Sequence, residues 1–280
     1  MKQNVLKTAE DITRIQSSLQ TQQDPDIIKW LAPMDHGSQH SRYWKLREPK
    51  TGMWFLNSKE YNTWRGSAGK LLFCQGMPGA GKSVLSALVI EKLSSIIRQT
   101  PSIGLAYIYC DYGRREHQTP LYLISSLTQQ LCLLSPTLPP CVKALHDLHH
   151  LRTTRPLLKE MCQVFQETVQ SFTQVYVVID ALDELSAKAG YLRTFLDELL
   201  KAKRSSSTLS MLFTSRHLAL QDVRHYFNDA IKVDISALRG DIEKFIDGHV
   251  SKLSPTGPIR TYALLEREVK NTVAQAAKGM

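Results

Sequence analysis

The stretch GMPGAGKS at residues 76–83 decides the fold of this chain, because it has the phosphate-binding pattern G-x-x-x-x-G-K-[ST]. An apolar run, residues 70–75, precedes it, and apolar residues recur at helical spacing from Lys82 to Ile96. A strand, a glycine-rich turn and a helix in this order can hold phosphates, because the amides at the helix N-terminus point at the anion. The sequence therefore predicts a site for a nucleoside triphosphate with Mg²⁺.

Within this site, Lys82 is expected to reach the β- and γ-phosphates, and the hydroxyl of Ser83 is expected to bind Mg²⁺. A plain glycine-rich turn is the weaker interpretation, since a chain of this length contains the pattern by chance roughly one time in a hundred. The predicted nucleotide-binding residues are Gly76, Met77, Pro78, Gly79, Ala80, Gly81, Lys82, Ser83 and Val84.

A cluster of acids follows the apolar run Val175–Ile179, namely Asp180, Asp183 and Glu184. Ligands of an open α/β sheet bind at the carboxyl ends of its strands, which is where these acids are expected. Asp180 can hold Mg²⁺ through its water shell, and Asp183 or Glu184 can orient and deprotonate an attacking water. The residues do not decide between the last two. Capping of the next helix would explain one carboxylate but not three.

Arg216 ends the segment Thr214-Ser215-Arg216, directly after a further apolar run at residues 209–214. At the end of a strand of the same sheet, it could contact the γ-phosphate and report whether that phosphate is present. The alternative is an ordinary surface arginine.

Apolar runs and helical patterns alternate along the whole chain. Strands are predicted at residues 70–75, 103–110, 175–179, 209–214 and 230–234, and helices at 82–96, from Thr119-Pro120 onward, at Arg155–Phe172 and at 191–201. Nearly continuous apolar runs are typical of parallel strands that are covered on both faces. We therefore expect a three-layer α/β fold with a parallel five-stranded sheet, followed by the start of a helical subdomain at residues 241–253 and 262–278.

Four units are expected along the chain: an N-terminal helix and linker at 1–26, an aromatic-rich lead segment at 27–67, the core at 68–236 and the helical region at 237–280. The lead segment contains all four tryptophans of the chain, Trp30, Trp44, Trp54 and Trp64. Disordered spacers are poor in aromatic residues. The lead segment is therefore expected to pack on the core, with a place in the nucleotide pocket near residues 51–54 as the alternative.

Composition narrows the possible function classes. The chain has 280 residues, 42% of them hydrophobic, which is enough for one large core. Its formal net charge is +9, but basic and acidic residues are mixed along the sequence, so nucleic acid is not an expected partner. No apolar run is long enough to span a bilayer and no apolar signal region begins the chain, so a cytoplasmic location is expected. The five cysteines form no C-x-x-C pair and are expected to be buried free thiols.

These motifs, in this order, resemble the NACHT domain of the STAND class of signalling NTPases, and most closely the fungal type grouped as nephrocystin-3-like N-terminal domains. Similar stretches are Trp30-Leu31 and the residues at 51–54, 75–83, 109–112, 179–184 and 214–216, so the likeness runs from about Ile27 to the end. The usual motif has Gly where Ala181 stands, although the fungal subgroup commonly has Ala.

The resemblance implies a nucleotide-dependent switch with slow Mg²⁺-dependent hydrolysis of ATP or GTP. ADP or GDP would hold a closed monomer, and the triphosphate would open it to a homo-oligomer that engages an effector in fungal self-recognition, heterokaryon incompatibility or immunity. It also implies that the fourth strand lies between the first and the third. Family members carry effector and repeat domains that this chain lacks, so a fragment and a short natural form both remain open. The other interpretations are a non-catalytic interaction module stabilised by nucleotide, and a metabolic P-loop enzyme.

Overall fold

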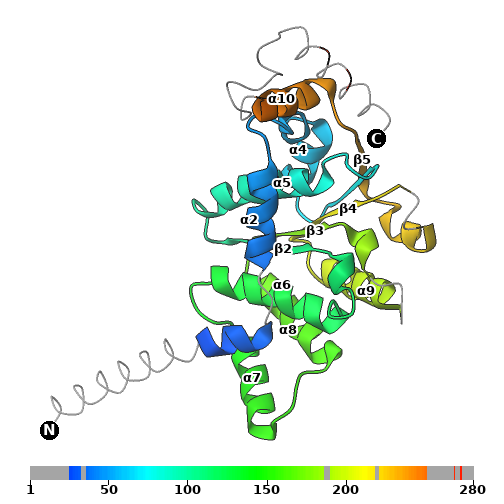
Figure 1. Ribbon diagram of the computed structural model, residues 1–280. Helices are drawn as coiled ribbons and strands as arrows, with labels where there is room; N and C mark the ends of the chain where they lie inside the picture. Colours follow the sequence, from blue (N-terminus) through cyan, green and yellow to red (C-terminus); the bar gives the residue numbers. More distant parts are fainter. Residues whose placement is uncertain are drawn as a thin grey trace, which may run out of the picture.

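A five-stranded sheet forms the centre of the computed structural model, which describes residues 25–32, 36–185, 190–217 and 221–250 together with Glu268 and Thr272. The strand order is β2-β3-β4-β1-β5, and every neighbouring pair is parallel (Figure 1). The strands are β1 (Leu71–Gly76), β2 (Ile103–Tyr109), β3 (Gln174–Asp180), β4 (Leu209–Ser215) and β5 (Ile231–Ile235). The predicted α/β fold with its parallel sheet is confirmed, and the fourth strand lies between the first and the third as the resemblance implied.

Helices cover both faces of this sheet (Figure 1). One layer contains α2 (His36–Leu46), α3 (Met53–Leu56), α4 (Lys59–Gly66) and α5 (Lys82–Ile97); the other contains a short helix at residues 25–31, α6 (Pro120–Leu134), α7 (Pro140–Arg152), α8 (Leu158–Gln170) and α9 (Tyr191–Ser205). Short 3₁₀ turns follow three of the strands, as η1 (Tyr112–Arg114), η2 (Leu182–Glu184) and η4 (Gln221–Phe227), and α10 (Arg239–Val250) follows β5.

Side chains of one strand alternate between two hydrophobic cores. In β1, Leu72 and Cys74 pack in the core under α5, whereas Leu71 and Phe73 pack in the core under α6, α8 and α9. Both faces of β1 are therefore buried, and the same holds for most of β2, β3 and β4, whereas β5 at the sheet edge has exposed residues. This explains why the strands read as continuous apolar runs in the sequence.

Part of the predicted lead segment packs on the sheet through its aromatic residues. Trp64 is fully buried, and its indole Nε1 donates a hydrogen bond to the carbonyl of Met211 in β4, at 3.0 Å. Phe55 and Tyr61 lie in the same core. By contrast, Trp44 is 36% exposed. The aromatic residues of this segment therefore differ strongly in burial.

Two helices in the second layer differ from the sequence-based expectation. The predicted helix Arg155–Phe172 is too long, because α8 begins only at Leu158 and ends at Gln170. Pro156 disfavours a helical conformation at Arg155, and the Glu160 carboxylate accepts a hydrogen bond from the Leu157 amide at 2.7 Å, which caps the helix there. Helix α7 is not among the helices predicted from the sequence.

The start of the predicted helical subdomain is present as α10. Of the second helix predicted for it, at residues 262–278, only Glu268 and Thr272 are described, both in helical conformation, and the N-terminal helix predicted within residues 1–26 falls almost entirely outside the described residues. Within the described ranges, no helix combines the length and the apolar character needed to cross a membrane. Cys74, Cys110, Cys132 and Cys162 are buried and Cys141 is half-buried, and all five are free thiols.

Candidate functional site

The loop between β1 and α5 has a backbone that only glycine adopts easily. Gly79 and Gly81 have φ angles of 81° and 90°, in the left-handed region. At Gly76, a Cβ atom would lie 2.5 Å from the carbonyl oxygen of Ile235 in the neighbouring strand. The predicted loop therefore curls tightly between β1 and the N-terminus of α5, where its amides and the helix dipole favour an anion.

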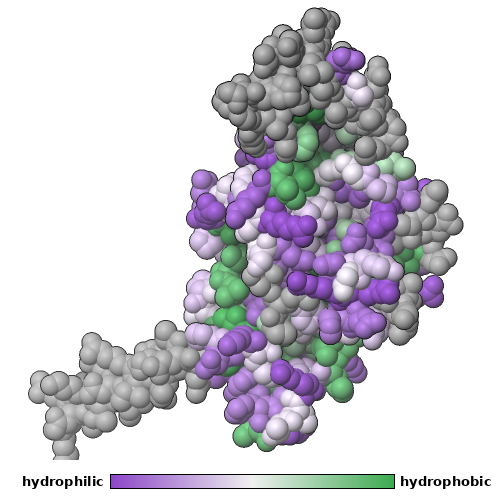
Figure 2. Space-filling view, viewed as in Figure 1, coloured by the Kyte–Doolittle hydropathy of each residue, from purple (hydrophilic) through white to green (hydrophobic). Residues whose placement is uncertain are grey.

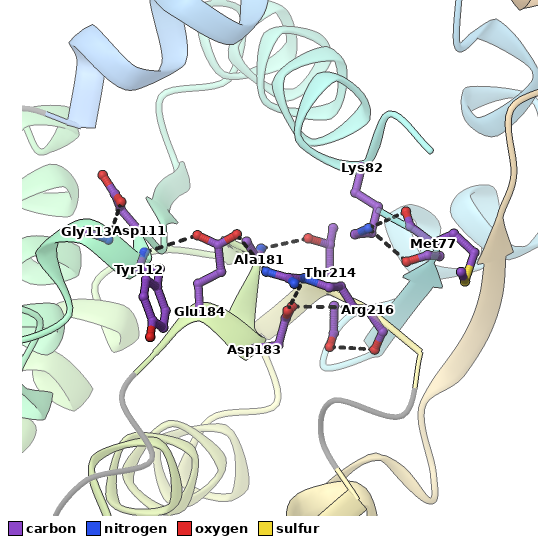
Figure 3. A network of polar contacts seen from close by, with 12 residues as sticks. Met77, Lys82, Asp111, Tyr112, Gly113, Ala181, Asp183, Glu184, Thr214 and Arg216 are labelled. Carbon is purple, nitrogen blue, oxygen red and sulfur yellow. Dashed lines mark hydrogen bonds and ion pairs between the residues drawn. The ribbon is translucent and has the colours of Figure 1, made fainter. Parts of the chain in front are cut away.

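Lys82 lies across this loop (Figure 3). Its Nζ donates hydrogen bonds to the carbonyl oxygens of Gly76 and Met77, at 2.8 and 2.9 Å. Burial lowers the pKa of Lys82, and the nearby carboxylates of Asp183 and Asp180 oppose that shift. The ammonium group is thus held at the place where a bound phosphate would need it.

Asp180 is buried at the end of β3, with an exposed fraction of 1%. Its Oδ1 accepts hydrogen bonds from the hydroxyls of Ser86 and Thr214, both at 2.7 Å. Burial raises the pKa of Asp180, and the nearby hydroxyls of Ser83, Ser86 and Thr214 together with Lys82 partly counteract the shift. The two residues predicted to hold Mg²⁺, Ser83 and Asp180, are therefore brought together.

Asp183 and Glu184 form a separate group with Arg216 (Figure 3). Arg216 Nε lies 2.9 Å from Asp183 Oδ2, its backbone amide donates to Asp183 Oδ1 at 3.1 Å, and its Nη2 donates to Glu184 Oε1 at 3.4 Å. The other oxygen of Glu184 accepts a hydrogen bond from the Tyr112 amide at 3.1 Å. The two candidate bases thus share one arginine as their partner.

The acids of the cluster therefore do not converge on a single point. In the part of the chain that the structure describes, no group of three His, Cys, Asp or Glu side chains is arranged to hold a metal ion. Asp180 faces the loop serine, whereas Asp183 and Glu184 face Arg216. The surroundings of the three acids therefore differ.

Ala181 connects the two groups in a strained backbone conformation. Its φ and ψ are 53° and 47°, in the left-handed region that glycine adopts without cost. The amide of Ala181 donates to the Thr214 hydroxyl at 2.8 Å, which fixes the turn against β4. This conformation explains why a glycine is the usual residue at this position of the motif that the sequence resembles.

A cavity of about 340 Å³ opens beside the loop at residues 76–83, which contributes Gly79, Ala80 and Gly81 to its lining. Three distant parts of the chain contribute to it: the lead segment, the loop with the first turns of α5, and the segment from β5 into α10. Its lining includes Trp54, Ala80, Val84, Leu85, Leu88, Leu238, Ile242 and Phe245. On the face in Figure 2, hydrophobic residues gather next to α10, and Leu238 and Phe245 at the cavity are 42% and 46% exposed.

Contacts between the lead segment and α10 hold this cavity together. The Asp241 carboxylate accepts a hydrogen bond from the Gly52 amide at 2.7 Å, and Lys244 Nζ donates to the carbonyl of Lys50 at 3.2 Å. Gly52 approaches α5 so closely that a Cβ atom would lie 2.7 Å from the side chain of Leu85. Trp54 lines the cavity, as expected if the lead segment contributes to the nucleotide pocket. Trp64 is buried against the sheet, as expected if the segment packs on the core.

The residues present fit a nucleoside triphosphate with Mg²⁺. The loop and Lys82 offer donors for phosphates, and Ser83 with Asp180 offers the oxygen ligands that Mg²⁺ prefers. The apolar cavity next to the loop offers a place for a base. The sequence did not point to Ser86 or Thr214, and of this cavity it indicated only a possible place near residues 51–54. A serine on the apolar face of α5 was the local signal for Ser86.

Comparison with solved structures gives distant matches. The ORC1 protein of Aeropyrum pernix, solved in complex with DNA, is 14% identical at a TM-score of 0.47, with 83% of this chain and 56% of that chain covered. Cdc6p of Pyrobaculum aerophilum is 15% identical at a TM-score of 0.48, with 73% and 50% covered. A Walker-type ATPase of Pyrococcus abyssi is 15% identical at a TM-score of 0.46, with 79% and 61% covered. The present chain thus spans about half to three fifths of the length of these structures.

No curated protein matches the chain. A family model does match, the one described as "Nephrocystin 3, N-terminal", and it covers residues 50–216. This range is more than half of the chain, includes the loop, the acid cluster and Arg216, and is shorter than the likeness read from the sequence. The chain therefore belongs to the nephrocystin 3 N-terminal family, which is NACHT-like.

Proposed function

We propose that this chain is a Mg²⁺-dependent, ATP-binding switch with slow hydrolysis. The observation that carries the proposal is the ion-paired set of Arg216, Asp183 and Glu184 beside Lys82 and the phosphate loop. A nucleotide that served only as a structural element would need no such set of acids.

In this proposal, the site residues have different roles in binding and hydrolysis. The loop amides and Lys82 bind the phosphates, and Ser83 with Asp180 holds the cation, which supplies charge neutralisation at the β- and γ-phosphates. Glu184 is the better candidate base, because its side chain is 29% exposed against 4% for Asp183 and its bond to Arg216 is longer, 3.4 against 2.9 Å. Asp183 is then the anchor that holds Arg216 in place.

Slow hydrolysis follows from the same contacts. One oxygen of Glu184 is bonded to Arg216 and the other to the Tyr112 amide, so both oxygens already have donors where an attacking water would have to bind. A γ-phosphate would compete for Arg216 and weaken its hold on Glu184. Triphosphate and diphosphate would therefore leave the pair in different arrangements, and such differential interaction is what a nucleotide switch requires.

The cavity favours adenine over guanine. Its lining beside the loop is mostly apolar, and the two carboxylates in it, Asp241 and Glu48, already have partners: Asp241 is bonded to the Gly52 amide and paired with Lys244 at 3.5 Å. Guanine carries a carbonyl and two donor groups on one edge, and an apolar pocket would leave them without partners. We therefore place ATP ahead of GTP.

The proposed oligomerisation, location and signalling role rest on the resemblance to the STAND class. We propose that nucleotide exchange leads to a homo-oligomer in the cytoplasm and that the signal serves fungal self/non-self recognition or immunity. The second candidate function is a non-catalytic module stabilised by nucleotide. It is favoured by the pairing of both candidate bases with Arg216, which would suppress hydrolysis if the arginine never moved.

The test is a titration of the purified full chain with ATP, GTP and ADP, with Mg²⁺ and with EDTA. We expect tight binding that Mg²⁺ strengthens, a preference for ATP, and ADP among the molecules released on denaturation. Lys82→Ala should abolish binding, whereas Lys92→Ala, which removes an exposed lysine from the same helix, should not. Equal ATP affinity in the Lys82→Ala variant and the wild type would overturn the site, and binding without turnover would favour the non-catalytic module.

A further inference from the structure

A turn directly after β2 provides one of the hydrogen-bond partners of Glu184. The Tyr112 amide donates to Glu184 Oε2 at 3.1 Å (Figure 3). Within the turn, Asp111 Oδ1 accepts a hydrogen bond from the Gly113 amide at 2.8 Å, which bends the chain into η1. Because the donor to Glu184 is a backbone group, the conformation of this turn decides where that donor lies.

Two glutamine side chains bind the free side of β2, which is an edge strand of the sheet. Gln118 is fully buried; its Oε1 accepts from the Asp111 amide at 3.1 Å, and its Nε2 donates to the Tyr109 carbonyl at 3.4 Å. Gln130 of α6 makes the same pair of bonds with the amide and the carbonyl of Tyr107, at 3.0 and 2.8 Å. A side-chain amide can do this because it offers the same donor and acceptor as a peptide group.

Gln118 therefore extends the bonding of this edge beyond Tyr109, the last residue of β2. On the opposite side of the chain, the Cys110 amide donates to the carbonyl of Asp180 at 3.0 Å. Cys110 is thus bonded to β3 and Asp111 to Gln118. The chain is held from both sides directly before Tyr112.

The bond from Tyr112 is the contact of Glu184 that a bound triphosphate would leave in place. In the proposed switch, the γ-phosphate competes for Arg216, which frees Glu184 Oε1 for a water. The Tyr112 amide still holds Oε2 and so fixes the direction of the freed oxygen. We propose that Gln118 is a positioning residue for Glu184 and acts through the turn that carries the Tyr112 amide. The inference rests on the proposed function, because it concerns the same hydrolysis.

Gln118→Met tests the inference, because methionine is an adaptable side chain of similar length that cannot bond the Asp111 amide. We measure ATP affinity and single-turnover hydrolysis at a temperature where the variant is folded. The hydrolysis rate should fall roughly three- to tenfold, the effect of one hydrogen bond, while ATP affinity stays unchanged.

Gln130→Met is the matched control. It removes the same two bonds from the same strand edge, but at Tyr107 and not at the turn. Both glutamine variants should lower the melting temperature, because each leaves backbone groups of β2 with fewer partners. Only Gln118→Met should slow hydrolysis. The comparison therefore separates positioning of Glu184 from support of the sheet.

Asp111 allows the same test at an exposed position if Gln118→Met does not fold, since the Asp111 side chain is 40% exposed. Asp111→Ala removes the bond to the Gly113 amide and should slow hydrolysis. Asp111→Asn keeps an oxygen for that bond and loses only an exposed ion pair with Arg114 at 3.8 Å, so it should restore the rate.

A double-mutant cycle with Glu184→Gln shows whether Gln118 acts through Glu184. Gln118→Met should add nothing in the Glu184→Gln background, because the base is already gone. The inference is overturned if Gln118→Met hydrolyses ATP at the wild-type rate or faster, if Gln130→Met slows hydrolysis equally, or if the effect is the same in both backgrounds. A wild-type chain that binds ATP without hydrolysing it would overturn the proposed hydrolysis and this inference together.

Discussion

Arg216 contacts the Asp183 carboxylate through two donors, its backbone amide at 3.1 Å and its side-chain Nε at 2.9 Å. The Asp183 side chain is 4% exposed, so this pair is largely shielded from water, whereas the arginine is 48% exposed. The guanidinium is therefore anchored to Asp183 through Nε, while its Nη2 makes a longer bond of 3.4 Å to Glu184. In the proposed switch, this longer bond is the one that a γ-phosphate would replace.

Arg216→Ala is expected to weaken the preference for ATP over ADP by about tenfold, the order of one charge-assisted hydrogen bond to a phosphate. The measurement is the ratio of the two affinities, taken at a temperature where the variant is folded. Arg216→Lys keeps the charge but not the forked geometry, so it should retain only part of the preference. An unchanged ratio in Arg216→Ala would show that this residue does not sense the γ-phosphate.

Glu184→Gln is expected to slow ATP turnover by roughly 10²–10⁴-fold and to leave binding nearly intact, as for the loss of a general base. Asp183→Asn should act differently, because it removes the buried anchor of Arg216 and so lowers the melting temperature as well as turnover. Single-turnover hydrolysis and thermal unfolding of both variants separate these effects. If both single variants and the double variant hydrolyse ATP at the wild-type rate, neither acid is the base.

Ala181→Gly is expected to stabilise the chain. The left-handed conformation costs an alanine about 1–2 kcal/mol, and the larger chain entropy of glycine when unfolded offsets about 0.4–1 kcal/mol of the gain. The free energy of unfolding should therefore rise by about 0.5–1 kcal/mol in urea denaturation.

The same substitution at Ala87 is the control for that experiment. Ala87 is buried within α5 in an ordinary helical conformation, so Ala87→Gly should destabilise the chain by about 1 kcal/mol. Loss of stability in both variants would show that the backbone at position 181 stores no strain.

The sequence predicts β1 to β4 well because they are buried on both faces along most of their length, which makes each a short apolar run with clear ends. The loop at residues 76–83 is predictable for a related reason: its glycines, Lys82 and Ser83 act through local backbone geometry. By contrast, the start of α8 depends on Pro156 and on the bond from the Leu157 amide to Glu160, and a helical pattern alone extends the helix too far.

Contacts between distant parts of the chain could not be read from local patterns. Thr214 bonds Asp180 across 34 residues, and Ser86 bonds it across 94 residues. The cavity likewise joins the lead segment, the loop and α10, which no local pattern connects. The position of Arg216 near the loop was predictable from the family sheet order, but its pairing with both acids was not.

Two tryptophan substitutions test how much the lead segment contributes to the stability of the core. Trp64→Ala is expected to lower the free energy of unfolding by about 3–5 kcal/mol, because it removes a fully buried indole and its bond to the Met211 carbonyl. Trp44→Ala should cost no more than about 1 kcal/mol, because Trp44 is 36% exposed and its contact with Arg47, 4.6 Å from the ring centroid, is a surface cation–π interaction. Urea denaturation of the two variants compares the same substitution within one segment. Small and equal losses of unfolding free energy in both variants would show that the lead segment adds little to the stability of the sheet. A large loss in Trp64→Ala alone would show that this segment is part of the core.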